Sequence, residues 1–163
     1  MSVATVPQST EVLGELTLHR LLVAIDGSSN AELALAAAIT AARRDHATLT
    51  LITVGPDLAT GPAAWTVPVA CAFDQEAIDA DACERLKATV ARIPADIPVK
   101  TIYRRGRPGP EIIKAAKESD YDAIVLGARG VGTVGALMGS VSHYVLHHAD
   151  IAVFVAHAPR DHS

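Results

Sequence analysis

Residues 127–140, GARGVGTVGALMGS, are where this sequence most readily suggests chemistry, because five of these fourteen residues are glycine. Without a Cβ, glycine lets backbone N–H groups approach phosphate oxygens closely. Gly139 and Ser140 open a predicted helix, where unpaired N–H groups and the helix dipole favour an anion. Ser140 and Ser142 add hydroxyl donors, and Arg129 adds a positive charge. The stretch therefore predicts a phosphate site, with a purely structural turn as the alternative.

The glycine pattern narrows the kind of phosphate ligand. No Lys-Ser or Lys-Thr follows the glycines, so the stretch lacks the Walker A pattern of many ATPases and GTPases. Residues 130–135, GVGTVG, match the dinucleotide motif G-x-G-x-x-G, but that motif also needs an acidic residue at the end of the next strand. The only acidic candidate, Asp150, precedes the final predicted strand. A mononucleotide is therefore favoured over a nicotinamide cofactor.

The elements that must position these residues alternate between strand and helix. Short runs rich in branched apolar residues, such as HRLLVAI at 19–25, are typical of strands buried on both faces of a parallel sheet. The alternation predicts one α/β domain with an open, doubly wound, parallel five-stranded sheet and helices on both faces. The predicted strands are 19–25, 47–54, 97–106, 121–127 and 150–156, and the predicted helices are 29–44, 72–92, 107–120 and 140–148.

Two polar turns would face each other in such a sheet. They are IDGSSN at 25–30, after the first strand, and GARGVG at 127–132, after the fourth. Ligands of open α/β sheets bind beyond the carboxyl ends of the strands, where the strand order reverses. If strands one and four are neighbours, both turns border one crevice. Asp26 would there cap the first helix, which we favour, or hold a magnesium ion on bound phosphates. Ser29 and Glu32 have the spacing of a capping box for the same helix.

Composition and charge exclude several classes of protein. With 163 residues, half of them apolar and a fifth charged, the chain is sized for one globular domain. A net charge of −4 argues against general binding to nucleic acid or to anionic membranes. The first residues lack the basic and apolar regions of a signal peptide, and no apolar run is long enough to span a bilayer. Cys71 and Cys83 match no metal or redox spacing, so we expect free thiols and a cytoplasmic location.

The domain boundaries follow from where these patterns begin and stop. We expect a flexible N-terminal tail over residues 1–17, the domain over 18–158 and a C-terminal tail over 159–163. Residues 55–70 hold three prolines and two glycines, so they predict a long loop that either covers the crevice or is a variable insertion.

No residues form a recognisable catalytic pair. The sequence offers neither a nucleophile with an evident base nor two carboxylates with a defined role, and without a Walker lysine any ATP hydrolysis would be slow. His143 and His147 lie four residues apart on the last predicted helix, a spacing that can bind zinc, and His148 follows them. No third ligand obviously converges on the pair, so we favour a surface or dimer-facing role for these histidines.

Several motifs, in matching order, resemble the universal stress protein family over about residues 18–158. Nucleotide-binding members of that family carry Gly, two residues, Gly, nine residues, and then Gly followed by Ser or Thr. The elements of this pattern are matched by Gly127, Gly130, Gly139 and Ser140. In addition, HRLLVAIDGSSNAELALAAA resembles the family's opening strand and helix, RRGRPGPEII its Gly-x-Pro turn, and GSVSHYVLHHADIAVFVA its last helix and strand.

The resemblance implies a fold and a binding site. The family's sheet order is 3-2-1-4-5, in an adenine nucleotide alpha hydrolase-like arrangement that places strands one and four side by side. ATP or a related adenine nucleotide would lie between them, and members commonly form homodimers through the last strand, here 150–156. The implied contacts are Ala24, Ile25 and Asp26 from the first strand, Val54 at the adenine, Leu126, Gly127, Arg129 and Gly130 around ribose and phosphates, and Gly139, Ser140, Val141 and Ser142 at the phosphates.

One departure from the family pattern bears on the function. Eight residues, VGTVGALM, separate Gly130 from Gly139, where the binding pattern has nine. Gly132 and Gly135 could supply the backbone freedom to absorb the missing residue. We therefore expect an ATP-binding sensor or modulator of partner proteins in the stress response. The alternatives are an interaction protein of the same fold without nucleotide binding, and a slow ATP hydrolase.

Overall fold

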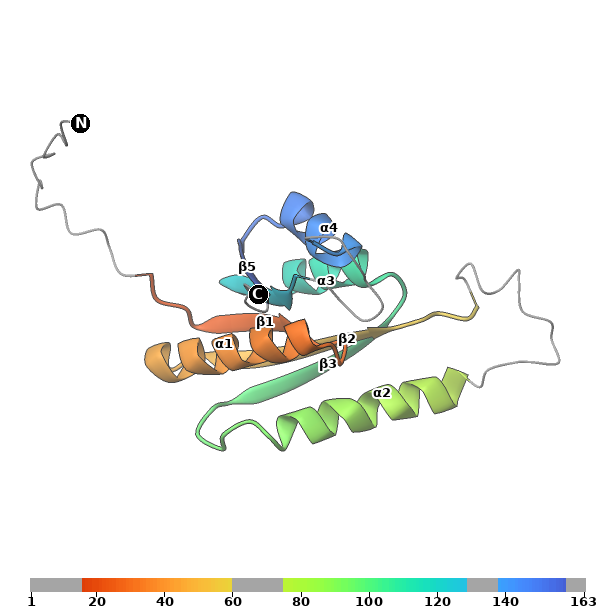
Figure 1. Ribbon diagram of the computed structural model, residues 1–163, viewed down its shortest axis with the longest axis horizontal. Helices are drawn as coiled ribbons and strands as arrows, with labels where there is room; N and C mark the ends of the chain where they lie inside the picture. The colour runs from red at the N-terminus through yellow and green to blue at the C-terminus, as the bar shows by residue number, and fades with distance from the viewer. Residues whose placement is uncertain (1–15, 60–74, 129–137, 158–163) are drawn as a thin grey trace, which may run out of the picture.

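Strands and helices alternate along the computed structural model, which describes residues 16–59, 75–128 and 138–157 (Figure 1). The strands are β1 Arg20–Ala24, β2 Thr48–Gly55, β3 Val99–Arg105, β4 Ala123–Gly127 and β5 Ala152–Ala156, and the helices are α1 Ser29–Asp45, α2 Gln75–Val90, α3 Pro108–Lys117 and α4 Ser140–His148. All pairings in the sheet are parallel, and the order is β3-β2-β1-β4-β5. The predicted doubly wound α/β fold and its strand order are confirmed.

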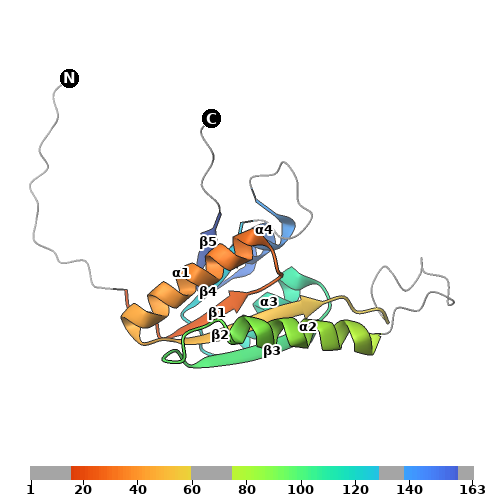
Figure 2. The same ribbon diagram turned by 60° about the horizontal axis from the view of Figure 1, so that its bottom comes forward.

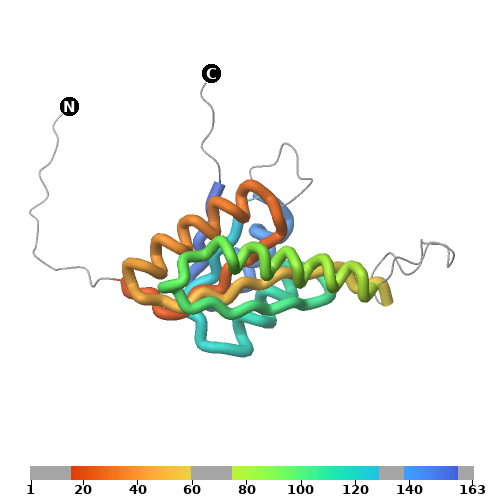
Figure 3. The backbone as a smooth tube through the Cα atoms, turned by 90° about the horizontal axis from the view of Figure 1, so that it is seen from below, coloured from red at the N-terminus to blue at the C-terminus, as the bar shows by residue number. Residues whose placement is uncertain are grey.

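Helices cover both faces of the sheet. α1 and α2 pack on one face, and α3 and α4 pack on the other (Figures 1 and 2). Seen from below, α1 and α2 run over the same face (Figure 3). Leu21, Leu22 and Val23 of β1 are fully buried, because alternate side chains enter opposite cores. This double burial explains why the strand reads as a continuous apolar run.

The pairing of β1 with β4 positions the candidate site. Leu21 pairs with Ala123 and Val23 with Val125, so the turns after both strands emerge at the same edge of the sheet. Gly127, at the end of β4, lies against the first turn of α1. A Cβ on Gly127 would lie 2.7 Å from the backbone carbon of Asn30, which leaves room only for glycine. The close approach of strand and helix therefore depends on this one residue type.

Several expectations fall on residues 1–15, 60–74, 129–137 and 158–163, which lie outside the described residues. They include both tails, most of the predicted 55–70 loop, and Cys71, so the domain boundaries stay predictions. Cys83 is a free, partly buried thiol. Among the residues that the structure describes, no helix is both long and apolar enough to cross a bilayer.

Candidate functional site

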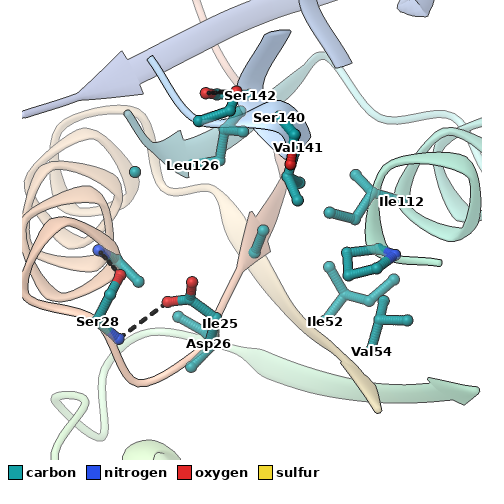
Figure 4. Close-up of a pocket in the computed structure, with 15 residues that line it drawn as sticks. Ile25, Asp26, Ser28, Ile52, Val54, Ile112, Leu126, Ser140, Val141 and Ser142 are labelled. Atoms are coloured by element: carbon teal, nitrogen blue, oxygen red, sulfur yellow. Dashed lines mark hydrogen bonds between the residues drawn. The ribbon is translucent and has the colours of Figure 1, made fainter. Parts of the chain in front are cut away.

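A cavity of about 290 Å³ opens at the carboxyl ends of β1, β2 and β4, between the first turns of α1, α3 and α4 (Figure 4). Its volume is near the lower end of the range for small-molecule sites. The lining residues come from five segments of the chain that the fold brings together. They are Ala24, Ile25, Asp26, Ser28, Ala31, Ile52, Val54, Pro108, Ile112, Leu126, Gly127, Gly139, Ser140, Val141 and Ser142.

Ten of the twelve residues predicted as nucleotide contacts line this cavity. The other two, Arg129 and Gly130, lie outside the described residues. Five lining residues were not predicted, namely Ser28, Ala31, Ile52, Pro108 and Ile112. Strand alternation could have identified Ile52, because it is two residues before Val54 and shares its face. The ten predicted residues are Ala24, Ile25, Asp26, Val54, Leu126, Gly127, Gly139, Ser140, Val141 and Ser142.

The turn from β1 into α1 differs from its predicted form. The N-cap of α1 is Ser28, whose Oγ accepts a hydrogen bond from Ala31 N at 3.1 Å. Asp26 is not the cap: its Oδ1 accepts from Ser28 N at 2.9 Å and tightens the turn before it. The predicted capping box of Ser29 and Glu32 is therefore wrong. The Glu32 carboxylate instead pairs with a distant arginine, Arg92.

The Asp26 carboxylate is exposed and faces the cavity (Figure 4). Gly27 continues the turn with φ of +79°, a left-handed conformation that favours glycine. Asp26 is the only ionisable side chain among the described lining residues. In those residues, any attraction for an anion must therefore come from uncharged donors, which are backbone N–H groups and serine hydroxyls.

The start of α4 provides such groups. Gly139 is the N-cap and offers no side chain to satisfy the first turn. The first helical bond runs from His143 N to Gly139 O at 3.0 Å, so the N–H groups of Ser140, Val141 and Ser142 precede the hydrogen-bond ladder. All three residues line the cavity. The positive end of the helix dipole and three backbone donors thus border it.

Ser142 has a role that the sequence did not indicate. Its hydroxyl is buried and donates to Ala128 O at 2.7 Å, with Gly139 O a second acceptor at 3.0 Å. Gly139 N also donates to Ala128 O, at 2.6 Å. The hydroxyl proton of Ser142 is therefore committed to holding α4 against the end of β4. Only the hydroxyl of Ser140, which is exposed, fits the predicted role of a side-chain donor toward the cavity.

The start of α3 forms the opposite wall and is different in character. Its first and third residues are Pro108 and Pro110, which have no backbone N–H. Pro108 and Ile112 line the cavity together with Ile52 and Val54 of β2. This side of the cavity is accordingly apolar, which suits a flat organic ring better than a phosphate.

The two walls are held together by close helix packing. Gly109 of α3 lies against Tyr144 of α4, and a Cβ on Gly109 would be 2.7 Å from Cδ1 of that ring. The phenol ring of Tyr144 in turn stacks on the imidazole of His148, with centroids 3.9 Å apart. The spacing of the α3 and α4 starts therefore depends on a glycine at position 109.

A polar network lies beside the site at the ends of β2 and β3. Asp79 of α2 accepts hydrogen bonds from the Tyr103 hydroxyl at 2.6 Å and from Gln75 at 2.8 Å, and it pairs with Arg105. The bonds from Tyr103 and then Arg105 lower the pKa of Asp79. Burial, followed by the bond to Asp79, raises the pKa of Tyr103 to about 12. Gln75 also bonds to Pro56 O and Leu58 N, so the network anchors the chain that follows β2.

Two arginines near this rim are engaged by carboxylates. Arg104 pairs with Glu118, and Arg105 pairs with Asp79. Among the described residues, no three His, Cys, Asp or Glu side chains gather as a metal site.

A model of the universal stress protein family matches residues 17–157. The chain belongs to this family. Universal stress protein YxiE of Bacillus subtilis is 35% identical over 134 residues, covering 78% of this chain and 90% of that relative. The solved structure of universal stress protein UspA from Lactobacillus plantarum is 31% identical, has a TM-score of 0.72, and covers 88% of this chain and 100% of its own.

Two more remote members share the universal stress protein fold. One, from Archaeoglobus fulgidus, was solved in complex with dAMP. It is 23% identical with a TM-score of 0.62, and the match covers 87% of this chain and 100% of that one. The other was solved in complex with cAMP and is 22% identical with a TM-score of 0.58, covering 88% of this chain and 100% of its own.

Proposed function

We propose that this universal stress protein binds an adenine nucleotide, ATP foremost, in the cavity between β1 and β4. The observation that carries the proposal is the division of the cavity into an apolar wall and a wall of backbone donors. The apolar wall comes from β2 and α3, and the donors come from the first turn of α4. An adenine nucleotide has two parts that complement these walls, a flat base and an anionic phosphate chain.

Each part of a nucleotide would have its own partners in this cavity. Ile52, Val54 and Ile112 would contact the base, and the N–H groups of Ser140 and Val141 would bind phosphate oxygens. The neighbouring proteins solved with dAMP and cAMP support an adenine nucleotide as the ligand class. Leu126 and Gly127, with Arg129 and Gly130 from the sequence pattern, would surround the ribose and phosphates. A magnesium ion on the phosphates would find its protein ligand in Asp26.

Calorimetry on purified, nucleotide-stripped protein tests this proposal. ATP, dAMP and cAMP are titrated separately, and adenosine and inorganic triphosphate are titrated as the two halves of the ligand. We expect ATP to bind more tightly than either half, because only ATP reaches both walls. No heat and no shift in melting temperature at millimolar nucleotide would contradict the proposal. Mass spectrometry of small molecules that co-purify with the native protein would identify the preferred nucleotide.

The proposed role is that of a nucleotide-dependent sensor or modulator of partner proteins in the cytoplasmic stress response. The described lining contains no lysine or arginine and no nucleophile–base pair, so it offers little for phosphoryl transfer. Any hydrolysis should therefore be slow. Phosphate release that is unchanged when Asp26 and Arg129 are both replaced by alanine would show that it does not arise at this site.

A second function is favoured by the spacing of the glycines. The eight residues between Gly130 and Gly139 are one fewer than in the family's binding pattern, which suits an interaction protein that has lost nucleotide binding. Inserting one residue after Met138 separates the two functions. Binding that appears only in the insertion variant would assign the native chain to the non-binding type.

We also propose that the protein is a homodimer formed through β5. β5 and β3 are the two edges of the sheet. β3 carries Lys100 and Arg105, charges that discourage edge pairing, whereas β5 exposes 42% of Phe154. Light scattering after size exclusion tests the proposal. Phe154→Glu should give monomers, and Leu33→Glu, at a similarly exposed position on α1, should not. A monomeric native chain would contradict it.

A further inference from the structure

The outer face of α4 carries two histidines that nucleotide binding does not use. His143 and His147 are both exposed and are one helical turn apart. Their ring centroids are 4.5 Å apart, with the planes tilted by 59°. Within the described part of the chain, neither imidazole has a hydrogen bond or ion pair with another residue. Their ring nitrogens are accordingly available to a ligand.

This geometry suits a transition-metal ion. Zinc binds imidazole nitrogen at about 2.0–2.1 Å, so two ligating nitrogens on a tetrahedral ion lie about 3.3 Å apart. Rings with centroids 4.5 Å apart can reach that separation by rotating about their side-chain bonds. The spacing of the two histidines, i and i+4 on one helix, is also the spacing at which metalloprotease helices bind zinc.

We propose that His143 and His147 form a binding site for a divalent transition metal such as Zn²⁺ or Cu²⁺. The two imidazoles supply two ligands, and water fills the remaining positions, because no third ligand lies nearby among the described residues. α4 contains no lysine or arginine to repel a cation, and its C-terminal end favours positive charge. Cu²⁺ should bind most tightly, in keeping with the general order of affinities for nitrogen ligands.

The same helix provides a matched control. His148 lies on α4, but its Nδ1 is 2.7 Å from Tyr144 O and its ring stacks on Tyr144. His148 is therefore an exposed histidine like the two members of the pair, but it has no second histidine at the spacing of a ligand pair. Replacing His148 should leave metal binding unchanged, whereas replacing either member of the pair should not.

Calorimetry with ZnCl₂ on tag-free, nucleotide-free protein in a non-chelating buffer tests the site. We expect the native chain to bind one Zn²⁺. The affinity for Zn²⁺ should be at least about tenfold lower than native in His143→Ala and in His147→Ala, and native in His148→Ala. Equal binding by the native chain and both pair variants would overturn the proposal, as would no binding at 1 mM Zn²⁺, an order-of-magnitude ceiling for a specific site. Nucleotide is absent, so the result does not depend on the proposed function.

Electron paramagnetic resonance of bound Cu²⁺ provides a second measurement. The native chain should show two imidazole nitrogens on the ion, and each variant of the pair should show one. Because both side chains are exposed, the variants should unfold at the native temperature, and circular dichroism checks this. A spectrum that is identical in the native chain and both pair variants would place the copper elsewhere and overturn the proposal.

Discussion

The starts of α3 and α4 border the same cavity and have opposite chemistry. α3 begins Pro108-Gly109-Pro110, so two of its first three residues lack an N–H group. α4 begins Ser140-Val141-Ser142 and keeps all three donors. The helix dipole is present at both starts, so the two differ in their N–H donors. The difference shows that the polarity of this cavity is set by which backbone donors the sequence removes.

Backbone chemistry of this kind would let an acidic protein accommodate the proposed anionic ligand. The net charge is −4, and the only ionisable side chain in the described lining is Asp26. A helix start without proline compensates locally, because its donors and dipole attract negative charge at short range. Substitutions at the two helix starts test this difference, and a substitution in the network beside β2 shows how far it is confined to them.

The largest effect should come from separating the two helix starts. Gly109→Ala places a Cβ 2.7 Å from the ring of Tyr144, so α3 and α4 must move apart. We expect the free energy of unfolding to fall by about 1–3 kcal/mol, as is typical for overpacking. Denaturant unfolding measures the change. In a double-mutant cycle, Tyr144→Ala should relieve part of the cost, and strictly additive effects would show that the ring is not the obstacle.

Removing one donor from α4 should weaken nucleotide binding next most strongly. Ser140→Pro deletes the N–H at the first helical position, where proline is well tolerated, and Gly139 already has the extended backbone that precedes proline. We expect about a tenfold loss in ATP affinity, the value of one hydrogen bond to a charged group. Ser140→Ala removes only the hydroxyl and is the control in the same calorimetric titration. Equal losses in both variants would assign the effect to the side chain.

A smaller effect should follow from loosening the network on the far side of β2. Tyr103→Phe removes one of the bonds to Asp79 and should lower stability by about 1 kcal/mol. The pKa of Tyr103 is raised from 10.0 to about 12, so its contribution is present below pH 10 and is lost as the pH rises toward 12. Between pH 9 and 12 the free energy of unfolding should therefore fall more steeply with pH in the native chain than in the variant. Unchanged ATP affinity would confirm that this network lies outside the binding walls.

The smallest effect should come from restoring a donor to α3. Pro108→Ala returns an N–H group to the first helical position, the reverse of the change at Ser140. We expect stability to fall by about 0.4–1 kcal/mol, because the unfolded chain gains freedom. ATP affinity should stay within about twofold, since in the proposed complex this wall faces the base rather than the phosphates. A large gain in affinity would show that phosphates approach α3 instead.

The fold was largely predictable because burial leaves a direct mark on the sequence. The run at 19–25 is apolar without alternation because Leu21, Leu22 and Val23 are covered on both faces. The adjacency of β1 and β4 had no such local mark. The residues left this adjacency open, and only the resemblance to the family implied it, since pairing of distant segments depends on the whole topology.

The site was predictable where a residue's role follows from its place at the end of a strand or the start of a helix. The cap of α1 was misassigned, since Ser28 and Ser29 are both acceptable N-cap residues and only the observed backbone of Ser28, with ψ of 158°, distinguishes them. The bond from Ser142 to Ala128 O could not be predicted, because it joins residues fourteen positions apart through the packing of α4 on β4. Ile112 was missed as a lining residue because its place in the cavity depends on how α3 packs against the sheet.

Ala128 O accepts hydrogen bonds from both Gly139 N and the Ser142 hydroxyl, so the chain is fastened on either side of residues 129–138. Loop-closure entropy grows only with the logarithm of the number of residues enclosed. Lengthening these ten residues by one therefore costs about 0.1 kcal/mol. Such a change is almost invisible to folding. Closing this segment through Ala128 O therefore constrains its length only weakly.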